Sequence, residues 1–106
     1  KCGITGTMKI AHLAESFGMN CEIHTTTMNY MDIANLHVSC AIRNCHYFEY
    51  FVPEEDFMFP MSERLPIDAN GMITVPKKPG IGVELDWDVV RDTCVSYCAA
   101  EYREGE

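Results

Sequence analysis

The fold of this chain is decided by two short runs, MNCEIH at residues 19–24 and YFEYFV at residues 47–52. In the first run apolar and polar side chains alternate, which is typical of a strand with one face against a core. The second run combines aromatic and β-branched residues, which favour strands. Each run follows a segment with helical periodicity. Residues 5–52 therefore predict the order helix, strand, helix, strand.

Both helices are predicted from their apolar spacing and from the residues at their ends. The first covers residues 5–17, with Thr5 or Thr7 as N-cap and Gly18 as the left-handed residue after its end. Its apolar stripe consists of Ile10, Leu13, Ala14 and Phe17. The second begins after Asn29, where Asp32 completes a variant of the capping box, and runs to about residue 42. Its stripe consists of Ile33, Leu36, His37 and Cys40.

The alternation of helices and strands predicts an α/β fold with a parallel sheet or barrel. Two strands and two helices cannot close such a sheet, because a parallel sheet needs both faces and its edges covered. We therefore expect residues 1–52 to be one part of a larger sheet. Residues 53–106 differ in character and form a second unit. This unit has an acidic loop at 54–56, a hairpin turn at Asn70-Gly71, and a final helix from about Trp87 to Tyr102 capped by Asp86.

Composition narrows the classes of protein to which the chain can belong. Its 106 residues are 47% hydrophobic and 23% charged, as in one ordinary globular domain or a piece of one. A net charge of −8 argues against binding to nucleic acid or to an anionic membrane surface. No apolar run approaches the ~18 residues that a membrane span needs. The chain begins without Met or an apolar leader, so we expect its beginning to lie elsewhere. Six irregularly spaced cysteines predict reduced, buried thiols in a cytoplasmic protein rather than a disulfide framework.

Two side chains stand out as candidates for chemistry. His24 ends the first predicted strand, and in parallel α/β folds the carboxyl ends of strands carry catalytic groups, so it is a candidate general base. The alternative is a structural histidine in the Thr-rich loop that follows. Glu49 lies among aromatic residues, where burial should raise its pKa and keep it as a neutral hydrogen-bond donor. The alternatives are a carboxylate paired with Arg43 or a Lys, or one that faces water.

Metal and phosphate sites are not predicted within this chain. The soft ligands Cys21, His24, Cys45 and His46 do not have the spacing of common zinc sites. The acidic residues at 54–56 lack ligand spacing as well, and residues 3–6 match no phosphate-binding loop. We therefore assign no metal ligand to these 106 residues.

Several motifs taken in order resemble a known family. KCGITG at 1–6, KIAHLAE at 9–15, His24, FEY at 48–50 and PGIGVE at 79–84 are similar to the end of the enolase superfamily, in the mandelate racemase / muconate lactonizing enzyme family and its mandelate racemase subgroup. The resemblance implies a modified (β/α)7β TIM-type barrel with an α+β capping domain. Residues 1–52 would then supply the last two β/α units of the barrel. Residues 53–106 would be the C-terminal segment that returns to the capping domain.

The resemblance also implies a chemistry. Such enzymes remove the proton α to a carboxylate and form an enediolate that is held on Mg²⁺. His24 would be the base or acid, and Glu49 would hydrogen-bond the enediolate. The Mg²⁺ ligands, and an Asp that orients the histidine, would lie on strands that precede Lys1. The family commonly has two glycines where this chain has only Gly3. We therefore expect the 106 residues alone to be inactive.

Within this family we favour a dehydratase that acts on an acid sugar over a racemase that acts on a 2-hydroxy acid. Dehydration is common in the subgroup, and the polar run at 24–27 suits a polyol. The expected partner is thus a small carboxylate substrate, and the parent enzyme is expected to be a homo-oligomer. The alternative is a non-catalytic barrel fragment that serves only as a folding or assembly unit.

Overall fold

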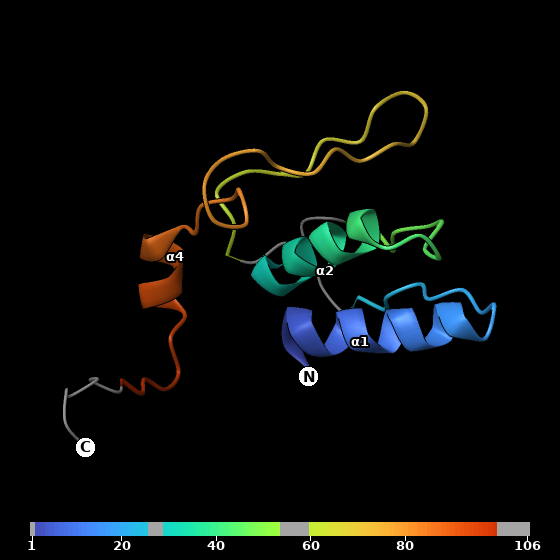
Figure 1. Cartoon of the computed structure of the whole chain (residues 1–106). Helices are drawn as coiled ribbons and strands as arrows, with labels where there is room; N and C mark the ends of the chain where they lie inside the picture. The colour runs from blue at the N-terminus through green and yellow to red at the C-terminus, as the bar shows by residue number, and fades with distance from the viewer. Residues whose placement is uncertain (1, 26–28, 54–59, 100–106) are drawn as a thin grey trace, which may run out of the picture.

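Two helices packed side by side form the base of the molecule. The computed structural model describes residues 2–25, 29–53 and 60–99, in which the helices are α1 (Gly3–Ser16), α2 (Tyr30–Ala41) and α4 (Trp87–Asp92). Figure 1 shows α1 and α2 running in the same direction, each followed by an extended segment that leads back along them. Residues 60–85 form a long arm beside α2, and α4 stands beyond the end of this arm.

Helix α1 begins two residues earlier than predicted and ends at Ser16, one residue earlier than predicted. Its N-cap is Cys2, which makes no capping hydrogen bond with its side chain, so the predicted Thr caps are wrong. At the other end, Gly18 has a φ of 66°. Gly18 N–H donates to the Glu15 carbonyl (2.9 Å) and Met19 N–H donates to the Ala14 carbonyl (2.9 Å). This pair of bonds is a Schellman motif, which needs a residue that tolerates positive φ.

The apolar stripe predicted for α1 does not face the core of the described residues. Leu13 is 61% exposed and Phe17 is 75% exposed, and Ile10 is exposed as well. The helix instead buries Ala11 against Val38 of α2. In the part of the chain that the structure describes, α2 is the only helix that contacts α1. Since one small neighbour covers only one face, the larger apolar face of α1 is left on the surface.

Helix α2 is anchored at its start and buried along one side. The predicted capping box is confirmed, because the Asn29 side chain accepts from the Met31 N–H (2.8 Å) and Asp32 accepts from the Asn29 N–H (3.3 Å). Ile33 and Leu36 are buried, and they pack against the arm residues Met61 and Leu65.

The rest of the predicted α2 stripe is only partly buried. His37 Nε2 donates to the carbonyl of Ile81 in the arm (2.9 Å), which ties the return segment to the helix. Cys40, which was predicted to belong to the buried stripe, is exposed.

The two predicted strands are extended segments without a strand ladder. Neither 19–24 nor 47–52 is paired into a strand within the described residues, whose only bridges are two isolated antiparallel ones in the arm. Asn44, which is buried, holds the first segment in place. Its carbonyl accepts from Cys21 N–H (2.7 Å), and its Nδ2 donates to the carbonyls of Ala11 (3.1 Å) and Met19 (3.0 Å). A parallel ladder is stable only between covered neighbours, and such neighbours are absent from the described residues.

The arm contains the predicted hairpin. Its two limbs are bridged at Met61–Leu85 and at Ile67–Ile73. At the tip, Gly71 N–H donates to the Asp68 carbonyl (3.0 Å), and Gly71 has a φ of 76°. A tight turn followed by a left-handed glycine is a common hairpin connection. The turn predicted at Asn70-Gly71 is therefore confirmed, whereas the acidic loop at 54–56 lies outside the described residues.

The last helix is shorter than predicted. The Asp86 carboxylate caps α4 as expected and accepts from the N–H groups of Asp88 and Val89. The helix then ends at Asp92 instead of continuing to Tyr102, and residues 93–99 are not helical. None of its residues is buried. A helix this short gains its stability from packing, so the lack of a contact surface accounts for its early end.

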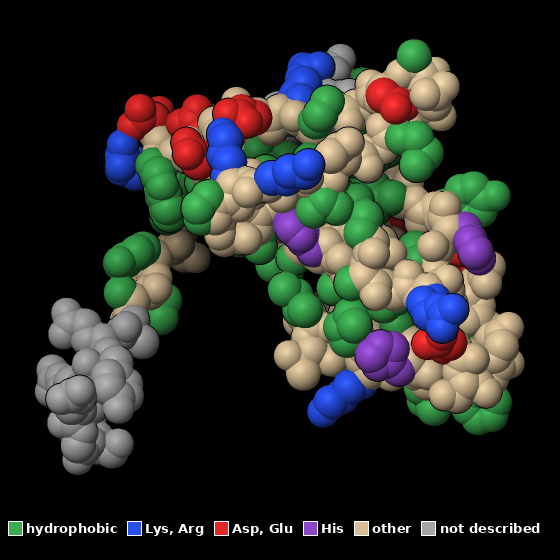
Figure 2. Space-filling view, turned by 45° about the horizontal axis from the view of Figure 1, so that its top comes forward, with side chains coloured by type: hydrophobic (Ala, Val, Ile, Leu, Met, Phe, Trp, Pro, Cys, Tyr) green, Lys and Arg blue, Asp and Glu red, His purple; other side chains and the backbone are tan. Residues whose placement is uncertain are grey.

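The chain exposes more surface than a compact monomer of its size. Its accessible surface is 8221 Å², compared with about 6,000 Å² expected for 12.0 kDa. Its radius of gyration is 16.1 Å, compared with about 13 Å expected for this length. Figure 2 shows hydrophobic side chains lying open on the surface beside charged ones.

The six cysteine side chains are exposed or partly exposed to solvent. All six carry free thiols, and none is fully buried, so their predicted burial is wrong. No helix among the described residues is long and apolar enough to cross a membrane.

Candidate active site

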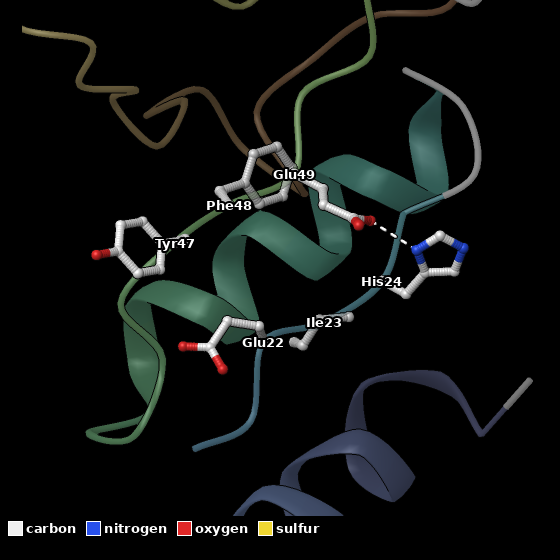
Figure 3. A pocket seen from close by; sticks show the side chains of 6 residues that line it. All are labelled: Glu22, Ile23, His24, Tyr47, Phe48 and Glu49. Carbon is white, nitrogen blue, oxygen red and sulfur yellow. Dashed lines mark hydrogen bonds and ion pairs between the residues drawn. The ribbon is translucent and has the colours of Figure 1, made fainter.

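The two extended segments lie side by side and leave a hollow of about 180 Å³ between them. Figure 3 shows the six residues that line it, three from each segment: Glu22, Ile23, His24, Tyr47, Phe48 and Glu49. Both sequence-predicted site residues, His24 and Glu49, are therefore in this hollow. They come from helix–segment units that are adjacent in the sequence, His24 from the end of one segment and Glu49 from within the next.

His24 and Glu49 are hydrogen-bonded to each other. The imidazole Nδ1 lies 2.7 Å from the carboxylate Oε2, and Figure 3 shows the carboxylate pointing at the ring. The side chains are 72% and 50% exposed, respectively. Because an ionised carboxylate can only accept, Nδ1 is the protonated nitrogen. When the ring is neutral, Nε2 then carries the lone pair and can take up a proton.

Thr25 belongs to the polar run 24–27 that the sequence suggested for a polyol, but it was not singled out as a contact of Glu49. It is only 1% exposed, although half of the side chain of its partner Glu49 is open to solvent. Its N–H donates to Glu49 Oε2 (2.7 Å), and its hydroxyl donates to the backbone carbonyl of Glu49 (3.2 Å). A β-branched hydroxyl residue directly after a strand-end histidine was the available signal. The other threonines of that run, Thr26 and Thr27, lie outside the described residues.

The environment of Glu49 lowers its pKa. The largest cause is the hydrogen bond from the Thr25 N–H, and the bond and charge of His24 add to it, whereas partial desolvation acts in the opposite direction. The carboxyl group is therefore ionised at neutral pH. The expectation that aromatic neighbours bury Glu49 and raise its pKa is wrong. The aromatic neighbours Phe48, Tyr50 and Phe51 pack against the core cluster, while half of the Glu49 side chain stays exposed.

The partner of Glu49 is not the cation that the sequence analysis considered as one alternative. The carboxylate pairs with His24, which lies 25 positions earlier, and not with Arg43 or a lysine in any contact seen for the described residues. Glu22 lies towards the other end of the hollow (Figure 3). Its Oε1 accepts from the His46 N–H (3.2 Å). The two carboxylates of the hollow are thus each engaged by N–H donors.

The residues of this hollow do not fit a magnesium ion. Mg²⁺ takes six oxygen ligands in near-ideal octahedral geometry. Glu22 and Glu49 lie apart in Figure 3 and already accept hydrogen bonds. Across the described residues, no group of three or more His, Cys, Asp or Glu side chains is placed to hold a metal ion.

A second hollow of about 550 Å³ lies between the end of α2, residues 45–48 and the hairpin tip. Its lining is mostly apolar, and its titratable side chains are the thiols of Cys40 and Cys45, His46 and Tyr47. Desolvation raises the pKa of the Cys40 thiol, and the nearby Cys45 adds to this shift. A thiol with a raised pKa is a poor nucleophile at neutral pH. The smaller hollow, with its charge-assisted pair, is therefore the better candidate for catalysis.

Comparisons with known proteins agree on one family. Residues 1–89 match the family described as Enolase C-terminal domain-like. A D-xylonate dehydratase from Haloferax volcanii is 31% identical over 88 residues, which is 83% of this chain and 21% of that protein. A provisionally named L-rhamnonate dehydratase from Caldivirga maquilingensis is 31% identical over 94 residues, covering 83% of this chain and 22% of that protein.

A solved structure of a related protein is similar to this chain as well. A protein from Pseudovibrio sp., provisionally named a mandelate racemase/muconate lactonizing enzyme, superposes with a TM-score of 0.81 at 34% sequence identity. The superposition covers 88% of this chain and 25% of that one. The chain thus spans about a fifth of the length of the curated relatives that it matches.

Proposed function

Because this chain belongs to the Enolase C-terminal domain-like family of the enolase superfamily, we propose that it forms part of a longer enzyme that dehydrates an acid sugar. The enzyme class and the α/β fold follow from the family and from the similarity to a solved member at 34% identity. Two relatives that carry dehydratase names, one for xylonate and one for rhamnonate, support dehydration of a sugar acid. Racemisation of a 2-hydroxy acid is the second reaction open to the same site.

The observation that carries the proposal is the 2.7 Å contact between His24 Nδ1 and Glu49 Oε2. It gives the imidazole a defined tautomer and leaves Nε2 directed away from the carboxylate, open to a substrate. General acid–base catalysis needs such an oriented group within reach of the reacting proton. A neighbouring negative charge also stabilises the imidazolium that forms when the ring takes up a proton.

Dehydration of a sugar acid needs proton transfers that His24 can perform. A base removes the proton from the carbon next to the substrate carboxylate, and an acid delivers a proton to the hydroxyl on the following carbon as its C–O bond breaks. Water leaves, and the remaining enol gains a proton on carbon as it becomes a 2-oxo acid. His24 is the residue of this chain that can exchange a proton at Nε2 in either of the first two steps. Within this chain Glu49 is the acid that contacts the ring, and in the parent enzyme the Asp expected on a strand before Lys1 would orient it.

The remaining features of the site are assigned to the rest of the parent enzyme. A bound Mg²⁺ ion would stabilise negative charge on the substrate carboxylate, and its ligands are proposed to lie on barrel strands outside this chain. Residues 1–52 are proposed to complete the barrel, and residues 53–106 to return to the capping domain. The surface exposed beyond that of a compact monomer supports this layout, because neighbouring barrel units would cover it. A cytoplasmic homo-oligomer remains our prediction for the parent enzyme.

The proposal is tested on the full-length protein that contains this chain. It is incubated with Mg²⁺ and a panel of aldonic acids and of 2-hydroxy acids without a 3-hydroxyl group. Formation of a 2-oxo acid from an aldonic acid supports the dehydratase. Racemisation of a 2-hydroxy acid without a 2-oxo product supports the second reaction. No change in any substrate, and no exchange of the α-proton with deuterium from solvent, would support the non-catalytic alternative.

A further inference from the structure

We propose that Glu22 is a positioning residue that forms an ion pair with a cationic side chain of the parent enzyme, a lysine or an arginine from a barrel strand outside this chain. This inference rests on the proposed function, because it places Glu22 inside the proposed barrel, behind His24. Glu22 lines the same hollow as His24 and Glu49. Figure 3 shows its carboxylate towards the other end of that hollow. This carboxylate takes no part in the proton transfers proposed above.

Glu22 faces the same side of its segment as His24. Its neighbours Cys21 and Ile23 pack against the buried cluster that joins α1 to α2. Since side chains alternate along an extended segment, Glu22 and His24 point away from the helices, and both are exposed. In a β/α barrel, the side chains that point away from the helices fill the interior. Glu22 would therefore lie inside the parent barrel, about 6.6 Å behind His24 along the strand.

A carboxylate in the interior of a barrel needs a positive partner. Taking an ionised side chain out of water is costly unless an opposite charge and hydrogen bonds compensate. Within this chain Glu22 has one neutral donor, the His46 N–H, which lies 3.2 Å from Oε1. It makes no ion pair with any of the described residues, and none of the six residues that line the hollow is a lysine or an arginine. We therefore assign its partner to the strands that would close the barrel around it.

The charge of the proposed substrate makes this pairing relevant to function. A sugar acid would bring a further negative charge close to the carboxylates of Glu22 and Glu49, and like charges at such distances repel each other. A cation paired with Glu22 offsets one of these charges. The ion pair would also hold that cation at a fixed place behind the imidazole of His24. The site could then bind an anion at a lower electrostatic cost.

The crystal structure of the full-length protein tests the pairing directly. We expect a Lys Nζ or an Arg guanidinium nitrogen within about 4 Å of a Glu22 carboxylate oxygen. A Glu22 side chain that contacts only neutral groups, water or a metal ion would overturn the inference. This measurement does not depend on turnover. An enzyme inactive on every sugar acid would count against the proposed function, while the structure still tests Glu22.

Thermal stability separates an ion pair from two charges that are merely close. Glu22→Gln should lower the melting temperature of the full-length enzyme by several degrees, because it leaves a buried cation unpaired. Replacing the cationic residue by methionine as well removes both charges, and this double variant should regain most of the lost melting temperature. It should fold even if Glu22→Gln alone does not. A double variant no more stable than Glu22→Gln would contradict the inference.

Substrate binding gives a readout that a merely structural role would not change. Glu22→Gln leaves an extra positive charge in the site, so KM for the sugar acid should fall roughly two- to fivefold, as for one unit charge several ångströms away. The double variant should restore the wild-type KM. The matched control is Glu15→Gln, which removes an exposed carboxylate on α1 and should change neither KM nor the melting temperature. A KM that stays unchanged in Glu22→Gln, or falls equally in the double variant, would overturn the inference.

Discussion

Glu49 Oε2 lies 2.7 Å from His24 Nδ1, although the two residues are 25 positions apart in the sequence. His24 stands at the end of the extended segment that follows α1, and Glu49 stands within the segment that follows α2. Successive helix–segment units place equivalent ends next to each other. The contact therefore reflects the repeating arrangement of the fold. The pair is therefore placed by the fold, although both side chains are half or more exposed.

The first prediction concerns proton transfer by His24. His24→Asn should lower kcat of the full-length enzyme roughly 10²–10⁴-fold, because asparagine cannot exchange a proton at neutral pH. The measurement is steady-state turnover of a sugar acid that the wild type dehydrates. His12→Asn, which replaces an exposed histidine on α1, is the matched control and should retain activity. Wild-type turnover by the His24 variant would remove this residue from the mechanism.

The second prediction concerns the charge of Glu49. Glu49→Gln keeps the shape but removes the negative charge that balances the imidazolium and selects its tautomer. A neutral amide in the corresponding position of a catalytic triad lowers kcat by about 10⁴, so we expect a loss of roughly 10²–10⁴-fold here. The melting temperature should change little, because the ion pair is largely exposed.

Glu63→Gln is the matched control for this prediction, since Glu63 forms an exposed pair with Lys78 in the arm (2.8 Å). It should change neither kcat nor the melting temperature. If Glu49→Gln instead loses stability while it keeps its turnover, Glu49 is a structural carboxylate and not part of the site.

The third prediction concerns pH and the hairpin. Hydrogen bonds from the N–H groups of Met72 (2.9 Å) and Asn70 (2.8 Å) lower the pKa of Asp68. Its contribution to stability is therefore present above the usual Asp value of about 3.9 and is lost as the pH falls through the lowered folded value. The amide proton shifts of Met72 and Asn70 should titrate with a midpoint below about 3.9. Asp68→Asn should abolish this titration, and a midpoint at or above the usual value would contradict the prediction.

The fourth prediction concerns the 106 residues in isolation. The apolar face of α1 with Leu13 and Phe17 is exposed, and the extended segments lack a ladder among the described residues. We expect the isolated chain to unfold over a broad, concentration-dependent transition, because its apolar face and unpaired segments would associate. Thermal unfolding and sedimentation at several concentrations test this. A sharp transition of a monomer, independent of concentration, would show that the chain folds by itself.

The sequence by itself determined the features that depend on neighbours within one turn. The start of α2 follows from Asn29 and Asp32, whose side chains and N–H groups are three residues apart. The end of α1 follows from Gly18, because only a residue without a Cβ takes positive φ at little cost. The hairpin tip follows from Gly71 for the same reason. His24 was found because the alternating pattern ends there.

Only the tertiary structure decided how these elements face one another. The stripe of α1 was read from spacing alone, but which face is buried depends on the size and position of the neighbour, and Ala11 is the residue that meets α2. The ionisation of Glu49 could not be read from its aromatic neighbours either, since its hydrogen-bond donors come from His24 and Thr25. A pKa depends on what lies within a few ångströms, and contacts between residues some 25 positions apart form only when the chain folds.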